Sequence, residues 1–120
     1  MTATTARKTA AKRPAKAADP LASVVAEVHS AAKGIGDLPS TLVGGHLPER
    51  GADTYRKRGD DWDRINRDRE AEGRLGIDGL AVQVAFSAFG GRTLDEIRGG
   101  LVRLASLAVA AIGQIDREAK

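Results

Sequence analysis

The longest apolar stretch of the chain runs from Leu101 to Ile115 and places apolar residues on almost every side of a helix. The four residues from Thr93 to Glu96 precede it and have the form of a capping box, in which a hydroxyl and a carboxylate accept hydrogen bonds from neighbouring amides. This pattern predicts a helix over residues 93–118. A helix that is apolar all round is buried on more than one side. We therefore expect other helices, or a second chain, to pack around it.

The length of this stretch favours a core helix over a membrane span. A span needs roughly twenty mostly apolar residues, and Leu101–Ile115 is shorter and contains Arg103. Two interpretations of its least apolar side stay open: a stripe of small residues that another helix approaches closely, or simply a weakly apolar edge. The residues on that side are Arg103, Ser106, Ala110, Gly113 and Arg117.

A second apolar segment precedes this helix and pairs with it in the predicted core. Asp78 can begin a helix, and residues 80–89 carry a broad apolar stripe that Gly90-Gly91 ends. Because the connection is short, residues 78–117 are predicted to form an antiparallel helical hairpin. About ten large apolar side chains of this hairpin are expected to be buried as the folding core.

Two further helices are predicted before the hairpin. Asp19-Pro20 is typical of a helix start, and the apolar face that begins at Leu21 continues to Lys33-Gly34. Residues 34–52 are rich in Gly and Pro and predict a loop. Residues 53–74 carry opposite charges four positions apart, which is typical of a solvated helix.

Composition limits the fold to one small domain. The chain has 120 residues, no cysteine and 3% aromatic residues, so its core consists of Ala, Val, Leu and Ile without disulfides or thiolate metal sites. Residues 1–18 have no large apolar residue after Met1, which predicts a disordered basic tail. The predicted organisation is all-α: this tail, then a single helical domain over residues 19–120, a bundle that oligomerisation completes. No signal-peptide pattern is present, and we expect a cytoplasmic protein.

The net charge of +3 conceals a concentration of basic residues in the tail. A disordered basic segment binds nucleic-acid phosphates by releasing counterions, without sequence preference. The alternative is a leader that only keeps the protein soluble. The candidate nucleic-acid contacts are Arg7, Lys8, Lys12, Arg13 and Lys16.

Asp60, Asp61 and Asp63 form an acidic cluster in the polar helix. Carboxylate oxygens are the ligands that magnesium prefers, so the cluster is a candidate metal site. Arginines are interleaved with these acids and would neutralise them first. The pattern therefore favours a salt-bridged surface over a metal site.

Three segments are similar to a known family: Arg58-Gly59-Asp60-Asp61-Trp62, Glu72-Gly73-Arg74-Leu75, and Gly100 to Ala111 followed by Asp116-Arg117. Together they resemble the actinobacterial and phage branch of the MazG-like nucleotide pyrophosphohydrolases, over residues 58–117. The resemblance implies a helical fold and, in active members, magnesium held by carboxylates on two facing helices. Here residues 80–91 contain no acid, and Gly100 and Arg103 stand where acids are expected. The resemblance thus implies a relative that kept the helical scaffold and lost the catalytic ligands.

These observations predict a non-catalytic helical binding or assembly module that forms a homo-oligomer, with no cofactor and no membrane insertion. Two alternatives stay open. One is a magnesium-dependent nucleoside triphosphate pyrophosphohydrolase, and the other is a small DNA-associated protein that uses its basic tail. The acids available to the enzyme would be Asp60, Asp61, Asp63, Asp95 and Glu96. The predicted oligomer interface consists of Val82, Phe86, Phe89, Leu101, Leu104, Ala108 and Ile112.

Overall fold

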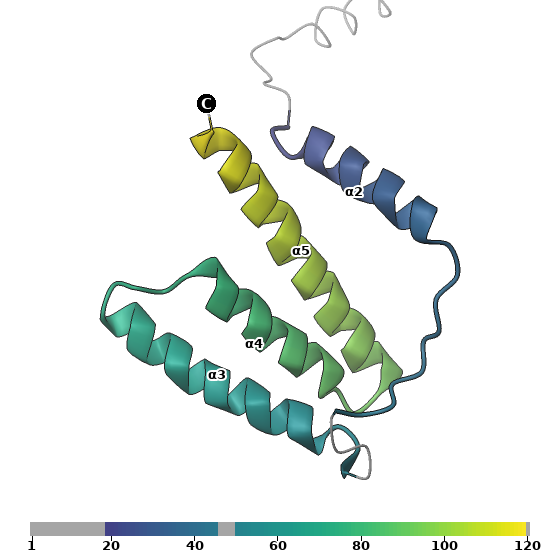
Figure 1. The fold of residues 1–120 in the computed structure, drawn as a ribbon, viewed down its shortest axis with the longest axis vertical. Coiled ribbons are helices and arrows are strands. Elements are labelled where there is room, and N and C mark those ends of the chain that lie inside the picture. The colour runs from purple at the N-terminus through teal and green to yellow at the C-terminus, as the bar shows by residue number, and fades with distance from the viewer. Residues whose placement is uncertain (1–18, 46–49, 120) are drawn as a thin grey trace, which may run out of the picture.

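The protein is all-α within residues 19–45 and 50–119, the part of the chain that the computed structural model describes. Its helices are α2 (Ala22–Ile35), α3 (Asp53–Ala71), α4 (Ile77–Phe89) and α5 (Leu94–Glu118). Figure 1 shows α4 beside the N-terminal half of α5, α3 on the far side of α4, and α2 beside the C-terminal half of α5. The predicted all-α fold is confirmed, and the predicted tail over residues 1–18 lies outside the described residues.

Helix α2 begins at Ala22 and not at Pro20 as predicted, and Asp19 stabilises the turn before the helix, whose N-cap is Leu21. The Asp19 carboxylate accepts a hydrogen bond from the Leu21 amide at 2.9 Å, and the Asp19 carbonyl accepts one from the Ala22 amide at 3.0 Å. The helix runs past Gly34 and ends at Ile35. Gly36 adopts a φ of 77°, a backbone angle that favours glycine, so it ends the helix where the sequence suggested Gly34.

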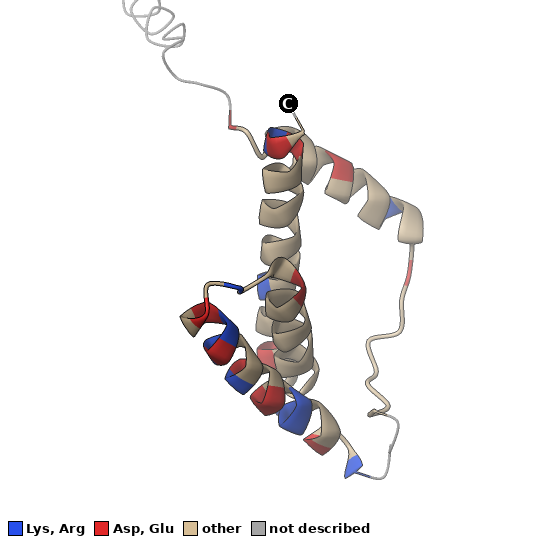
Figure 2. Ribbon diagram, turned by 60° about the vertical axis from the view of Figure 1, so that its left-hand side comes forward, with Lys and Arg blue, Asp and Glu red and all other residues tan. Residues whose placement is uncertain are grey.

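Helix α3 is the polar helix, with Asp, Glu, Lys and Arg spread along it (Figure 2). Arg67 pairs with Asp63 at 2.6 Å, and Arg64 pairs with Asp61 at 3.4 Å. Exposed ion pairs three or four residues apart each stabilise a helix by a few tenths of a kcal/mol. The predicted charged helix is confirmed, and it ends at Ala71, just before Gly73 with a φ of 72°.

Helices α4 and α5 form the predicted antiparallel hairpin. The Thr93 hydroxyl accepts from the Glu96 amide at 3.1 Å, as in a capping box. The Glu96 carboxylate accepts in return from the Arg92 amide at 3.0 Å, one residue before the amide that a capping box usually uses. The cap therefore also fixes the connection between the two helices.

Helix α5 meets its neighbours most closely at two glycines. A Cβ atom at Gly100 would lie 2.6 Å from the Cα atom of Ala88, so α4 and α5 approach almost to backbone contact there. A Cβ atom at Gly113 would lie 2.6 Å from Cδ2 of Leu21, the residue before α2. The small-residue stripe is thus a site of close approach at Gly113, whereas Ala110 on the same side is exposed.

The buried core is smaller than predicted. Among the described residues, the buried hydrophobic side chains are Val24 and Ala88, and no large side chain is fully buried. The buried residues of α5 are Gly100 and Gly113. The expectation of about ten buried large side chains is wrong for a single chain, because α4 and α2 cover α5 on two sides and leave the side between them open.

Candidate functional site

A polar groove of about 470 Å³ lies between α3 and α4. Asp60 and Asp63 of α3 line it together with Gln83 and Ser87 of α4, and Arg56 and Arg92 close one end. Acids, amides and cations thus share one concave surface. What this surface can do depends on how many of these groups already have partners within the chain.

Asn66, buried in α3, is the centre of a hydrogen-bonded bridge to α4. Its side-chain amide donates to the Gly79 carbonyl at 3.0 Å and to Oε1 of Gln83 at 2.6 Å. Gln83 donates in turn to Asp63 Oδ1 at 3.2 Å. A polar network therefore ties α3 to α4 and reaches the groove at Gln83 and Asp63, and Asp63 is already engaged by Gln83 and Arg67.

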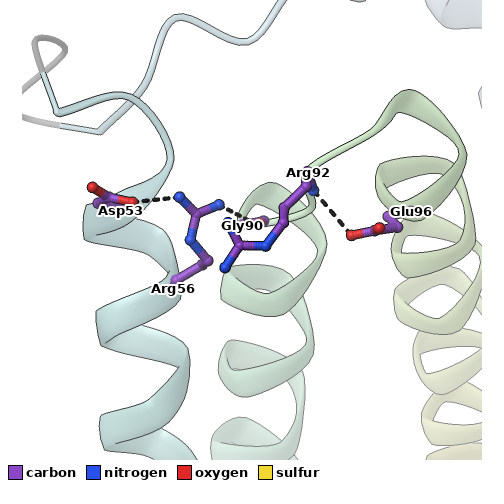
Figure 3. Close-up of polar contacts among 5 residues, drawn as sticks. All are labelled: Asp53, Arg56, Gly90, Arg92 and Glu96. Carbon is purple, nitrogen blue, oxygen red and sulfur yellow. Dashed lines mark hydrogen bonds and ion pairs between the residues drawn. The ribbon is translucent and has the colours of Figure 1, made fainter.

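The arginine end of the groove is also partnered within the chain (Figure 3). Arg56 donates through one terminal nitrogen to the Gly90 carbonyl at 2.8 Å, and its other terminal nitrogen pairs with Asp53. This contact joins the start of α3 to the end of α4. Arg92, which lines the same groove, donates from its backbone amide to the Glu96 carboxylate (Figure 3).

The acids proposed for magnesium are not gathered into a metal-binding group. Asp60 and Asp63 line the polar groove, whereas Asp61 pairs with Arg64. Asp95 and Glu96 belong to the first turn of α5, where Glu96 serves the cap. Within residues 19–45 and 50–119, no group of three or more His, Cys, Asp or Glu side chains could hold a metal ion.

The second candidate site is the open side of α5. A largely apolar groove of about 440 Å³ lies there. It is lined by Leu94, Ile97 and Leu101 of α5, by Phe89 of α4, and by Pro39 and Leu42 of the loop between α2 and α3. Leu94 is 74% exposed and Ile115, at the other end of the helix, is 61% exposed. Since large apolar side chains gain free energy when they leave water, this side of α5 is suited to protein contact.

The structure divides the predicted interface residues between two places. Phe86 and Phe89 of α4 pack on Tyr55 of α3, and their ring centroids lie 6.3 and 5.6 Å from that of Tyr55. Val82, also in α4, is half-buried. Leu104 lies one turn after Gly100, on the side of α5 that meets α4. The remaining three, Leu101, Ala108 and Ile112, share the open side of α5.

Two features of these sites could not be read directly from the sequence: the Asn66 bridge and the close approach at Gly100. Asn66 and Gln83 have no charge and no motif, and the available signal was an asparagine one turn after Trp62 on the less charged side of α3. The close approach at Gly100 could have been suspected from a glycine inside a long apolar helix. The candidate nucleic-acid residues Arg7, Lys8, Lys12, Arg13 and Lys16 lie outside the described residues.

Comparison with known proteins gives no relative from which a function could be transferred. No protein-family model, curated protein or solved structure matches the chain. By length and composition alone, α5 is the one helix among the described residues that could cross a membrane, a test that the core helix of a soluble protein also passes. The exposed apolar surface of α5 is therefore the feature on which a proposed function rests.

Proposed function

We propose that this chain is a non-catalytic helical assembly module whose function is to associate with further copies of itself. The observation that carries the proposal is the mismatch between its buried and exposed apolar residues. Val24 and Ala88 are the buried hydrophobic residues, whereas twelve large hydrophobic residues are exposed within the described part of the chain, Leu94, Leu101, Val102 and Ile115 of them on α5.

Energetics support association. Ordering each residue costs about 1–2 kcal/mol of backbone entropy, and small domains offset this cost by burying apolar surface. Burying one large apolar side chain contributes roughly 1.5–3 kcal/mol. A chain of 120 residues with so few buried side chains lacks much of that gain until its exposed apolar surface is covered.

The absence of catalysis is supported by what occupies the expected metal positions. The resemblance to MazG-like enzymes places an acid at Gly100, but a side chain there would collide with Ala88. Asp63 of the polar groove is held by Gln83 and Arg67. If the chain is a MazG-like relative, its helices now use these positions for packing.

The open side of α5 could be buried by a membrane or by a protein, and the charged residues of this helix favour a protein. Arg98 and Arg103 lie within the N-terminal half of this helix, and α3 with its many charges packs close to that half through α4. A charged residue at the centre of a bilayer costs several kcal/mol. We therefore propose that another copy of the chain covers the open side of α5, in a soluble assembly in the cytoplasm.

Sedimentation equilibrium of the full chain over a wide concentration range tests this function. We expect the molar mass of a dimer or a larger closed assembly at micromolar concentration, without detergent. A monomer at all concentrations, with native helix content, would overturn the proposal. Flotation of the protein with lipid vesicles in a parallel assay would point to the membrane instead.

A further inference from the structure

The open side of α5 carries a regular coiled-coil repeat. Leu94, Leu101, Ala108 and Ile115 recur every seven residues, and Arg98, Ala105 and Ile112 recur every seven residues between them. The alternating spacing of four and three is that of the two core positions of a heptad. Of these residues, all but the half-buried Ile112 are exposed. We call this row of seven residues the α5 seam.

The helices of the same chain flank the seam without covering it. Leu104 and Ala111, next to the seam on one side, follow Gly100 on the face that meets α4. Val102 and Val109, next to it on the other side, line a groove with Leu21, the residue before α2, and Val25 of α2, and Ala105 at the edge of the seam lines the same groove. A heptad seam needs a facing helix, and none of the described helices supplies one.

We propose that the α5 seam pairs with the α5 seam of a second copy, and that the two helices run antiparallel. This inference rests on the proposed self-association and adds its surface and orientation. The tail of the same chain is a poor occupant, because residues 1–18 contain no large apolar residue after Met1. A second copy, by contrast, offers an identical apolar row.

Charge selects the orientation. In a parallel pair, Arg98 would face Arg98 of the second copy inside the seam, where two like charges lose hydration and repel. In an antiparallel pair centred between Ala105 and Ala108, Arg98 instead meets Ile115 of the second copy, beside Asp116. That position is also the negative end of the partner helix, which favours a cation.

Size complementarity selects the same register. Leu101 then faces Ile112 of the second copy, and Ala105 faces Ala108, so small residues meet at the centre and large ones lie towards the ends. The groove of about 440 Å³ lined by Leu94, Ile97 and Leu101 receives the last turns of the second α5. Small central residues allow the two backbones to approach closely, as Gly100 does towards Ala88 within the chain.

The arrangement of the other helices is compatible with reversal. Helix α2 lies beside the C-terminal half of α5, and α4 lies beside the N-terminal half with α3 on its far side (Figure 1). When the second copy is reversed, its α2 lies next to the half of α5 that lacks one. In an antiparallel pair, α2 of each copy thus lies next to the N-terminal half of the other copy's α5, which has no α2 of its own beside it.

Cysteine cross-linking tests the orientation, because the natural chain contains no cysteine. Two single variants, Leu101→Cys and Ile112→Cys, are prepared separately, and a third sample is made by refolding them together. In the antiparallel register each thiol lies about 16 Å along the seam from its own copy, beyond the reach of a disulfide, whereas the mixed pair is adjacent. We expect oxidation to produce a covalent dimer in the mixture and little in either variant alone.

The other outcomes separate this inference from the proposed function. A covalent dimer from Leu101→Cys alone would indicate a parallel pair and overturn the antiparallel one. A dimeric mass by sedimentation with no cross-link in any sample would place the interface elsewhere and overturn the seam while leaving self-association intact. Monomeric variants beside a monomeric natural chain would overturn both.

Discussion

Gly100 of α5 and Ala88 of α4 stand so close that a Cβ atom at Gly100 would lie 2.6 Å from both the Cα and the Cβ atom of Ala88. Ala88 is completely buried by this contact. The hairpin therefore closes on a glycine at the point where the resemblance to MazG-like enzymes expects an acidic side chain. Any side chain at position 100 would collide with Ala88, so the close packing of the hairpin requires glycine there.

Gly100→Ala should destabilise the protein, although alanine is the better helix former. The added methyl group collides with the α4 backbone, and overpacking of this kind costs typically 1–3 kcal/mol. Gly99→Ala is the matched control, because a Cβ atom there meets nothing closer than an Arg103 nitrogen at 3.8 Å. That variant should be neutral or gain up to about 1 kcal/mol from helix propensity. Urea unfolding at equal protein concentration compares the two, and equal midpoints would contradict the close contact.

Asn66→Ala should weaken the attachment of α3 to α4. The substitution removes the donor to Gly79 and Gln83, and losing a hydrogen bond of this kind costs about 0.5–1.5 kcal/mol. Arg64→Ala, on the exposed side of the same helix, should change the free energy of unfolding by less than about 0.5 kcal/mol. If thermal denaturation ranks these two variants equally, the Asn66 bridge is not a stabilising contact.

Thr93→Ala should loosen the first turn of α5 and the connection before it. The Thr93 hydroxyl accepts from the Glu96 amide, and removing an N-cap of this kind costs about 0.5–2 kcal/mol. Thr93→Ser keeps the hydroxyl and serves as the control. Amide hydrogen exchange of Asp95 and Glu96 should accelerate in the alanine variant and stay near its natural rate in the serine variant. Unchanged exchange in both would show that the cap is dispensable.

Purified protein with magnesium and a panel of nucleoside triphosphates should release no pyrophosphate. The acids that could act are dispersed over α3 and the start of α5, and Asp63 is engaged within the chain. Magnesium-dependent turnover that Asp60→Asn abolishes would contradict a non-catalytic role and point to the polar groove. Calorimetry on the same samples distinguishes nucleotide binding without turnover from no interaction.

The helices and their ends could largely be predicted from the sequence, because caps and periodicity are local signals. Thr93 with Glu96, the charge pairs of α3 and the antiparallel hairpin are of this kind. The extent of burial could not be predicted, because it depends on how helices are placed around α5. The Asn66 bridge and the Gly100 contact depend on the rotation of one helix against another, which spacing along the chain does not determine. For the same reason the packing of Phe86 and Phe89 on Tyr55 could not be predicted.

The most direct test of association through the open side of α5 compares two identical substitutions on this helix. Ala108 and Ala110 are both exposed, but Ala108 lies in the α5 seam and Ala110 lies on the other side of the helix, beyond Gly113. Either alanine can be replaced by lysine without disturbing a buried contact. By sedimentation equilibrium, we expect Ala108→Lys to shift the chain towards monomer, raising the dissociation constant at least about tenfold for an unpaired buried charge. Ala110→Lys should keep the mass of the natural assembly, and equal behaviour of the two variants would contradict association through this side of α5.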